Sequence, residues 1–282
     1  MIRIGLTGWG DHPSLYTSTA AYKLVDYSAH FPVVEVDSSF YAIPRETTIR
    51  KWIDETPESF QFIVKAYKGM TGHLPKSEWP FDTAEEMFEA YRQAFLPTQQ
   101  SGKLAFLLFQ FPPSFLCGTK EVNLLRYIRQ QLPEFDIAIE FRHMSWFEGE
   151  RTQATLQFLQ EQRFIHTIVD EPQIGTGCVP KIVAQTAPKM FYRLHGRNDK
   201  GWINTFGSSE AWRKVRYLYN YSERELLDLQ KIVQREQGEQ YIIFNNNSGH
   251  HAAPNAKRLQ QLLQIEYEDL APMQLDLFKE DL

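Results

Sequence analysis

IAIEFRHMSW, at residues 137–146, decides the fold more than any other stretch of this sequence. Its first half is a short apolar alternation bounded by a proline and a glycine, which is typical of a β-strand. Its second half places Glu140, Arg142 and Trp146 where that strand should end. The period-two alternation of a strand puts Glu140 and Arg142 on one face. The stretch therefore predicts a strand with a polar tip.

Other strand-like runs also end on charged or amide residues. The predicted strands are 2–7, 33–37, 60–65, 104–110, 137–141, 164–170, 190–195 and 241–244. Helical patterns alternate with them at 18–30, 46–55, 83–95, 121–131, 152–162, 223–237 and 255–264. Such alternation predicts an α/β fold, a single (β/α)8 TIM-type barrel, with an irregular connection after the sixth strand and a long lid after the seventh. No G-x-G-x-x-G follows the first strand, which argues against a doubly wound sheet.

Composition limits the classes of function. The 282 residues carry a formal net charge of -5, which argues against a general nucleic-acid coat or a polybasic membrane binder. Cys117 and Cys178 are far apart and suggest neither a disulfide framework nor a zinc site. No apolar run approaches the ~20 residues of a membrane helix. We expect a soluble, cytoplasmic protein with no membrane partner.

The carboxyl ends of barrel strands carry the chemistry of this fold, because loops from several strands meet there. We expect Glu140 to be the leading acid or base and His195 the second proton-transfer group. Glu35 and Asp170, next to Glu171, would orient them. The predicted substrate-binding residues are Trp9, Tyr41, Lys65, Gln110, Arg142, Trp146, Arg193, Arg197, Asn245 and Asn246. The arginines and Lys65 would hold an anionic group.

Other interpretations of these residues stay open. The charges could form a purely structural network, because an unpaired buried charge is costly. Glu35, Glu140, Asp170 and His195 could hold a divalent metal, which we do not favour because Lys65 and Arg193 would compete for the carboxylates. Two carboxylates could also be a glycosidase pair. Lys65 could form a Schiff base, although nearby carboxylates would raise its pKa.

The segment after the seventh strand interleaves cations with aromatic residues, among them Trp202, Trp212, Arg216 and Tyr217. Such a pattern can stack on nucleobases or sugars. It is also typical of a lid helix whose aromatic side chains pack on the barrel and whose charges face water.

Several stretches together resemble the DUF72 (YecE-like) family. They are GLTGW (5–9), VEVDSSFY (34–41), FQFIVK (60–65), LLFQFPPSF (107–115), IEFRHMSWF (139–147), VDEP (169–172), FYRLHGR (191–197) and YIIFNNNSGHHAAPNA (241–256). The resemblance covers nearly the whole barrel and implies a TIM-barrel fold with no established reaction. It also implies recurrent positions at Phe40 and Gly196 besides the site residues above.

The last residues have a different character. We expect the barrel to span 1–266 and a tail to span 267–282, with the acidic sequence EDLAPMQLDLFKEDL reaching the end of the chain. QLDLF looks like the peptide by which bacterial replication and repair proteins bind the DNA sliding clamp. The predicted partner-binding residues are Gln274, Leu275, Asp276, Leu277 and Phe278.

Three functions are therefore expected. The first is an enzyme, a hydrolase or isomerase, acting on an anionic, phosphate-bearing small molecule or a nucleic-acid end. The second is a non-catalytic adaptor in DNA metabolism that binds the sliding clamp. The third is a carbohydrate-active barrel with paired carboxylates.

Overall fold

Eight parallel strands close into a barrel in which each strand pairs with its neighbours in chain order and β8 pairs with β1. The structure is a computed structural model and describes residues 1–16, 23–203, 212 and 215–273. The strands are β1 Ile2–Thr7, β2 Val33–Val36, β3 Gln61–Lys65, β4 Leu104–Gln110, β5 Ile137–Glu140, β6 Phe164–Asp170, β7 Lys189–Leu194 and β8 Glu239–Phe244. This topology confirms the predicted TIM-type barrel.

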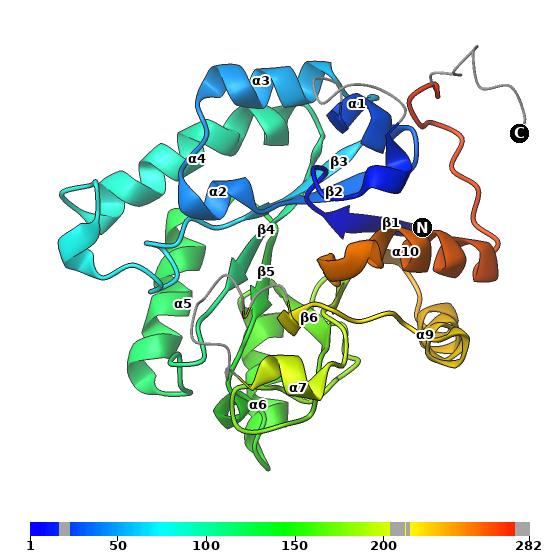
Figure 1. Cartoon of the computed structure of the whole chain (residues 1–282). Helices are drawn as coiled ribbons and strands as arrows, with labels where there is room; N and C mark the ends of the chain where they lie inside the picture. Colours follow the sequence, from blue (N-terminus) through cyan, green and yellow to red (C-terminus); the bar gives the residue numbers. More distant parts are fainter. Residues whose placement is uncertain (17–22, 204–211, 213–214, 274–282) are drawn as a thin grey trace, which may run out of the picture.

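Helices wrap the barrel in chain order, as the progression of colours around it shows (Figure 1). Their bounds are α1 Lys23–Ser28, α2 Ser38–Tyr41, α3 Glu46–Asp54, α4 Ala84–Gln100, α5 Thr119–Gln131, α6 Arg151–Glu161, α7 Asp199–Trp202, α9 Glu223–Arg235 and α10 Ala252–Leu262. α9 begins with a capping box between Ser222 and Glu225, which satisfies the first free backbone N–H groups of the helix.

The predicted strands agree with these bounds to within two residues at each end, and two helices differ by more. α4 continues past the predicted end at Phe95 and through Pro97, because Phe95 and Thr98 are both buried and hold the last turn against the barrel. α10 begins at Ala252, before the predicted start at residue 255, and Pro254 fits there because the first turn needs no N–H donor. Part of the predicted helix 18–30 lies outside the described residues.

Apolar side chains form two cores. One lies inside the barrel and includes Phe106, Phe191 and Tyr241, whose rings meet at centroid distances of 4.8 and 5.2 Å. The other lies between the strands and the surrounding helices. Residues that alternate along each strand therefore face different cores, as expected for strands covered on both faces.

The chain after α10 returns across the barrel wall. The backbone N–H of Ile4 donates to the Tyr267 hydroxyl at 2.9 Å, and the N–H of Ala271 donates to the Ser28 carbonyl at 3.1 Å. The described part of the predicted tail is therefore docked beside β1 and α1 (Figure 1). QLDLF lies outside the described residues. Within the described chain, no helix combines the length and apolarity that crossing a membrane requires.

Candidate functional site

The polar groups of the mouth extend the inner core toward the carboxyl ends of the strands. On six strands an inner-core residue is followed two positions later by a polar one: Val33 by Glu35, Ile63 by Lys65, Leu108 by Gln110, Ala138 by Glu140, Phe191 by Arg193 and Ile243 by Asn245. Because strand side chains alternate between faces, these polar groups all point inward. The predicted convergence of separate strand ends is present.

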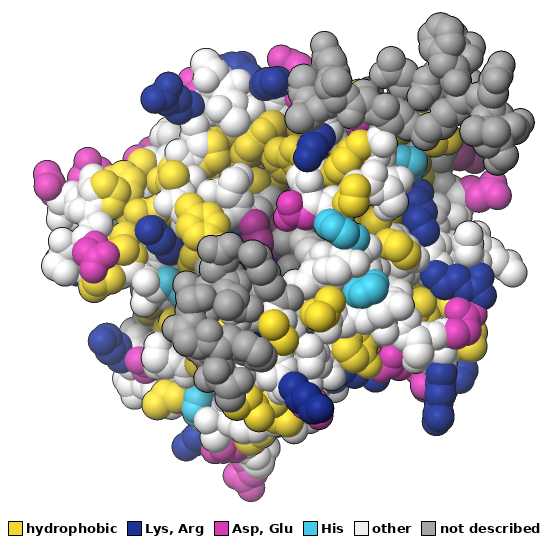
Figure 2. All heavy atoms as spheres, in the orientation of Figure 1, with side chains coloured by type: hydrophobic (Ala, Val, Ile, Leu, Met, Phe, Trp, Pro, Cys, Tyr) yellow, Lys and Arg dark blue, Asp and Glu magenta, His cyan; other side chains and the backbone are white. Residues whose placement is uncertain are grey.

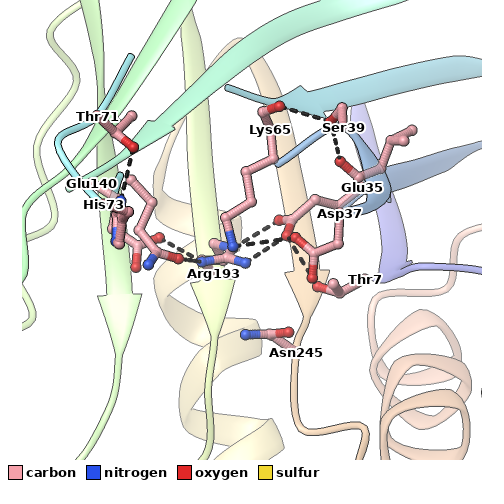
Figure 3. Close-up of polar contacts among 12 residues, drawn as sticks. Thr7, Glu35, Asp37, Ser39, Lys65, Thr71, His73, Glu140, Arg193 and Asn245 are labelled. Atoms are coloured by element: carbon pink, nitrogen blue, oxygen red, sulfur yellow. Dashed lines mark hydrogen bonds and ion pairs between the residues drawn. The ribbon is translucent and has the colours of Figure 1, made fainter. Parts of the chain in front are cut away.

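Arg193 is the centre of this cluster (Figure 3). Its Nε and Nη2 donate to the two oxygens of Glu35 at 2.7 and 2.5 Å. Its Nη1 donates to Gln110 at 2.8 Å and to Glu140 at 2.9 Å. Although burial opposes the shift, Glu35 and Glu140 raise the pKa of Arg193 well above its ordinary value. Arg193 is therefore a charged bridge between two buried carboxylates.

Glu140 and His195 are joined by a hydrogen bond of 3.1 Å. Asn245 Nδ2 lies 2.9 Å from His195 Nδ1, an arrangement that favours a proton on Nε2, which faces Glu140 and lies 3.3 Å from Arg142 Nη1. Burial lowers the pKa of His195 to about 3 despite the attraction of Glu140. The pKa of Glu140 is held well below its usual range because Arg193 and His195 outweigh its burial. Near neutral pH neither group is poised for the proton transfer we predicted.

Arg142 connects this cluster to Glu171. Its Nη1 donates to Glu140 at 3.1 Å, and its Nη2 lies 3.2 Å from Glu171 Oε2. The guanidinium carbon of Arg142 is 4.5 Å from the ring centre of Trp202, and that of Arg216 is 3.9 Å from the same centre. Within the described part of the chain, several buried polar atoms here have no hydrogen-bond partner: Arg142 Nε and Nη2, Arg216 Nε, Trp202 Nε1 and Glu171 Oε2.

Asp170 belongs to a separate cluster, not to that of Glu35 and Glu140 as we expected. Ile168, two positions earlier, packs in the outer core, so the alternation of β6 turns Asp170 to the outer side of the barrel. Arg197 donates to both oxygens of Asp170 at 2.7 Å, and Lys181 donates to it at 2.9 Å. Although burial opposes the shift, Arg197 and Lys181 lower the pKa of Asp170.

A cavity of about 540 Å³ lies beside this cluster. Asp170, Glu171, Lys181 and Arg197 line it, together with Asp199 from α7. Glu171 is only 3% exposed, and its Oε1 accepts the backbone N–H of Val179 at 2.8 Å. Burial raises the pKa of Glu171 to about 7, against the opposing charge of Arg142. A carboxyl group of this kind can exchange a proton near neutral pH.

The opposite side of the mouth holds Lys65. Its ammonium lies 3.3 Å from Asp37 and 4.9 Å from the ring centre of Phe40. Tyr41 packs edge-on against Phe40 and is 52% exposed at the rim. Acidic side chains gather near the centre of the face in Figure 2, with hydrophobic side chains around them.

Three predicted substrate-binding residues lie elsewhere. Trp146 is 1% exposed, stacks on Phe141 and donates its indole N–H to the Phe115 carbonyl at 2.8 Å, so it supports the wall. Trp9 packs edge-on against Trp52 in a different cavity. Asn246 is fully buried and donates to Tyr219 O and Asn255 Oδ1.

Glu171, Trp202 and Arg216 were not among the predicted site residues. Glu171 follows the last residue of β6, and adjacency to Asp170 was its only signal in the sequence. Trp202 and Arg216 belong to the aromatic and cationic pattern of the lid, which does not by itself separate packing from binding. Gly196 lets the lid leave β7, because its φ is +85° and a Cβ there would meet Tyr219 Cβ at 2.4 Å.

The donor set fits a metal ion poorly. Arg193 occupies both oxygens of Glu35 and one of Glu140, and Asp170 faces the other side of the barrel wall. Among the described residues, no group of three or more His, Cys, Asp or Glu side chains has the arrangement of a metal site. We derive no step through a metal.

Comparison with known proteins assigns the chain to a family. The family model described as "Protein of unknown function DUF72" matches residues 3–277. UPF0759 protein YunF of Bacillus subtilis (strain 168) is 50% identical over 284 residues, which cover 99% of this chain and 100% of that protein. A DUF72 family protein from Enterococcus faecalis V583 is 38% identical, with a TM-score of 0.90 over 98% of this chain and 100% of that chain.

A DUF72 family protein from Thermotoga maritima MSB8 is 29% identical and has a TM-score of 0.79 over 94% of this chain and 100% of that chain. The agreement in both sequence and structure extends over nearly the whole chain. The chain therefore belongs to the DUF72 family.

Proposed function

We propose that this protein is an enzyme, a hydrolase or isomerase, that acts at the carboxyl-terminal mouth of the barrel on a phosphate-bearing small molecule or nucleic-acid end. One observation carries the proposal. Glu171 lines a cavity of about 540 Å³, and its buried carboxyl group accepts the backbone N–H of Val179 and lies 3.2 Å from Arg142 Nη2. A carboxyl group held in place beside a cavity can act on a molecule that binds there.

The pKa of Glu171, raised by burial to about 7, supports a role in acid–base chemistry. A general acid or base works best when its pKa is close to the working pH. Glu171 can donate a proton to a leaving-group oxygen and recover one from water in a hydrolase, or move a proton between two positions in an isomerase. It replaces Glu140 and His195 in the role that we predicted for them.

Positive charge beside Glu171 supports an anionic substrate. Lys181 and Arg197 line the cavity, and Arg142 lies behind Glu171. Asp170 neutralises part of the charge of Lys181 and Arg197, whereas Arg142 keeps free N–H groups. A phosphate group accepts charge-assisted hydrogen bonds from such groups.

The proposal is tested by ³¹P NMR of a panel of sugar phosphates, nucleoside monophosphates and a 5′-phosphorylated oligonucleotide. This measurement detects hydrolysis as free phosphate and isomerisation as a new ester signal. We expect turnover of at least one compound and a loss of about 10²–10⁴-fold in Glu171→Gln, the usual contribution of a general acid or base. Glu148→Gln, a substitution of an exposed side chain, is the control. Equal turnover by wild type and Glu171→Gln, or no turnover of any compound, contradicts the proposal.

The adaptor function rests on the QLDLF sequence. We propose it as a second candidate, in which Gln274 and the apolar residues of the tail bind the bacterial sliding clamp. A pull-down with the clamp compares the intact chain with a Gln274→Ala/Phe278→Ala variant, and equal recovery of the clamp contradicts this candidate function.

The cytoplasmic location of the protein also stays a prediction.

The carbohydrate-active alternative is less favoured. The Arg193 guanidinium lies between Glu35 and Glu140 and bonds to both, which leaves no place between these carboxylates for a sugar and water.

A further inference from the structure

Arg142, Trp202 and Arg216 form a group that the proposed chemistry of Glu171 does not explain. We call it the arginine–tryptophan group. Both guanidinium carbons lie close to the Trp202 ring, at 4.5 and 3.9 Å from its centre. Three buried nitrogen atoms of the group have no polar partner in the part of the chain that the structure describes, namely Arg142 Nε, Arg216 Nε and Trp202 Nε1, whereas Arg142 Nη2 forms an ion pair with Glu171.

Unpaired N–H groups are costly in a buried place, and those on charged groups are the most costly. Native proteins satisfy nearly all such groups with protein, water or ligand. Stacking on Trp202 compensates part of the charge of the two arginines but accepts no N–H bond in the plane of the guanidinium. The group therefore offers several donors that converge from three side chains.

The charge balance favours a ligand with more than one negative charge. Arg142 and Arg216 bring two positive charges, and Glu171 is the carboxylate that lies within 3.2 Å of Arg142 on this side. Glu140, the other neighbour of Arg142, is also bonded to Arg193 and His195. A terminal phosphate is a dianion near neutral pH and has three oxygens that can accept from separate donors.

We propose that the arginine–tryptophan group binds the terminal phosphate of the substrate. The proposal rests on the proposed function and assigns the charged end of the molecule that is handled beside Glu171. Glu171 forms an ion pair with Arg142 and is one of the residues that line the cavity, so a phosphate bound by the group would lie next to the wall of that cavity.

Other cations of the mouth are less suited to this role. Arg193 already makes four hydrogen bonds to Glu35, Gln110 and Glu140. Arg197 makes two to Asp170 and one to Glu225. Binding a phosphate at either one requires breaking these bonds first.

Isothermal titration calorimetry with inorganic phosphate tests the proposal on the full chain. Arg216→Gln removes a charge, and we expect its Kd to rise by at least about tenfold. Trp202→Phe keeps a ring but removes its N–H, and we expect a rise of about fivefold. Trp212→Phe is the matched control, because the Trp212 N–H already donates to the Gly201 carbonyl at 2.8 Å. Its Kd should equal that of wild type.

Acetate titrated into wild type should bind at least about tenfold more weakly than phosphate, because it carries one charge. The proposal is overturned if wild type does not bind phosphate at millimolar concentration. It is also overturned if Arg216→Gln and Trp202→Phe, checked for a native melting transition, bind phosphate as wild type does.

These outcomes are distinguishable from those of the proposed function. Phosphate binding that depends on Arg216 and Trp202, with no turnover by ³¹P NMR, keeps the phosphate subsite and ends the enzymatic proposal. If turnover depends on Glu171 but phosphate binding is unchanged in the Arg216 and Trp202 variants, only the proposed phosphate subsite is contradicted.

Discussion

Arg193 and Arg142 lie in the same mouth, and both are almost fully buried, at 1% and 2% exposure, yet their surroundings differ. Arg193 makes four hydrogen bonds to three side chains. Arg142 donates to Glu140 and forms an ion pair with Glu171, but its Nε has no hydrogen-bond partner among the described residues and its guanidinium stacks on Trp202. The hydrogen-bonding groups of Arg193 are used within the protein, whereas Arg142 retains the capacity to bind another molecule.

The difference shows that charge at a strand end does not by itself indicate a binding site. A buried charge can serve only to hold the barrel together through ion pairs, as at Arg193. Removal of its partner then lowers the free energy of unfolding. A structural arginine and a ligand-binding arginine are told apart by whether each N–H group already has a hydrogen-bond partner within the protein. Predictions that compare the two arginines therefore test the account.

The largest expected effect concerns Arg193→Leu. This substitution leaves Glu35 and Glu140 buried, with Glu35 deprived of the guanidinium that holds both its oxygens. We expect the free energy of unfolding, measured with urea at neutral pH, to fall by about 3–5 kcal/mol. Arg50→Leu is the control, because its pair with Glu46 is more than 60% exposed on both sides, and it should cost about 0.5 kcal/mol or less. Equal losses in both variants would show that Arg193 is no structural bridge.

The next effect is a pH dependence caused by Glu171. Its pKa is about 7 in the folded protein against an ordinary value of 4.5, so the folded state binds this proton more tightly than the unfolded state. The contribution of Glu171 to stability is therefore fully present below pH 4.5 and falls as the pH rises toward 7. We expect the difference in unfolding free energy between wild type and Glu171→Gln to fall by up to about 3 kcal/mol across this window.

Urea unfolding of the two proteins at intervals of pH measures this difference. Taking the difference removes the titration of His195 and Glu140, whose lowered pKa values change stability in the opposite sense. A difference that does not change with pH would mean that Glu171 is an ordinary carboxylate.

The smallest effect separates two tryptophans. Trp146→Phe keeps the stack on Phe141 but removes the hydrogen bond to the Phe115 carbonyl, and we expect a loss of about 1–2 kcal/mol in stability. Its Kd for inorganic phosphate should not change, in contrast to that of Trp202→Phe. If Trp146→Phe weakened phosphate binding and left stability unchanged, Trp146 would be a substrate-binding residue and not a support of the barrel wall.

The fold was predictable from the sequence because each strand carries its own signal. Runs such as LAFLLFQ at β4 are apolar up to their last residue, since both faces of the strand are covered, and amphipathic helices separate them. The polar tips Glu35, Lys65, Glu140 and Arg193 were also predictable, because two-residue alternation continues the inner core into the mouth. These features depend on local patterns that the chain displays directly.

The roles within the site were not predictable to the same degree. Asp170 ends its strand just as Glu140 does, but the alternation of β6 turns it to the outer side of the barrel. The raised pKa of Glu171 comes from its burial, and Arg216 is distinguished by a buried Nε without a hydrogen-bond partner among the described residues; both are properties of the packed structure. The neutral state of His195 likewise follows from its burial in the packed structure, where its Nδ1 contacts Asn245, fifty residues away in the sequence.

The most direct test is a crystal soaked in tungstate, a heavy analogue of phosphate, and measured for anomalous scattering. We expect one peak within hydrogen-bond reach of Arg142 Nη2 and Arg216 Nε and no peak on Arg193. A peak on Arg193, with none at Arg142, would contradict the division of the mouth into an internally paired half and a ligand-binding half.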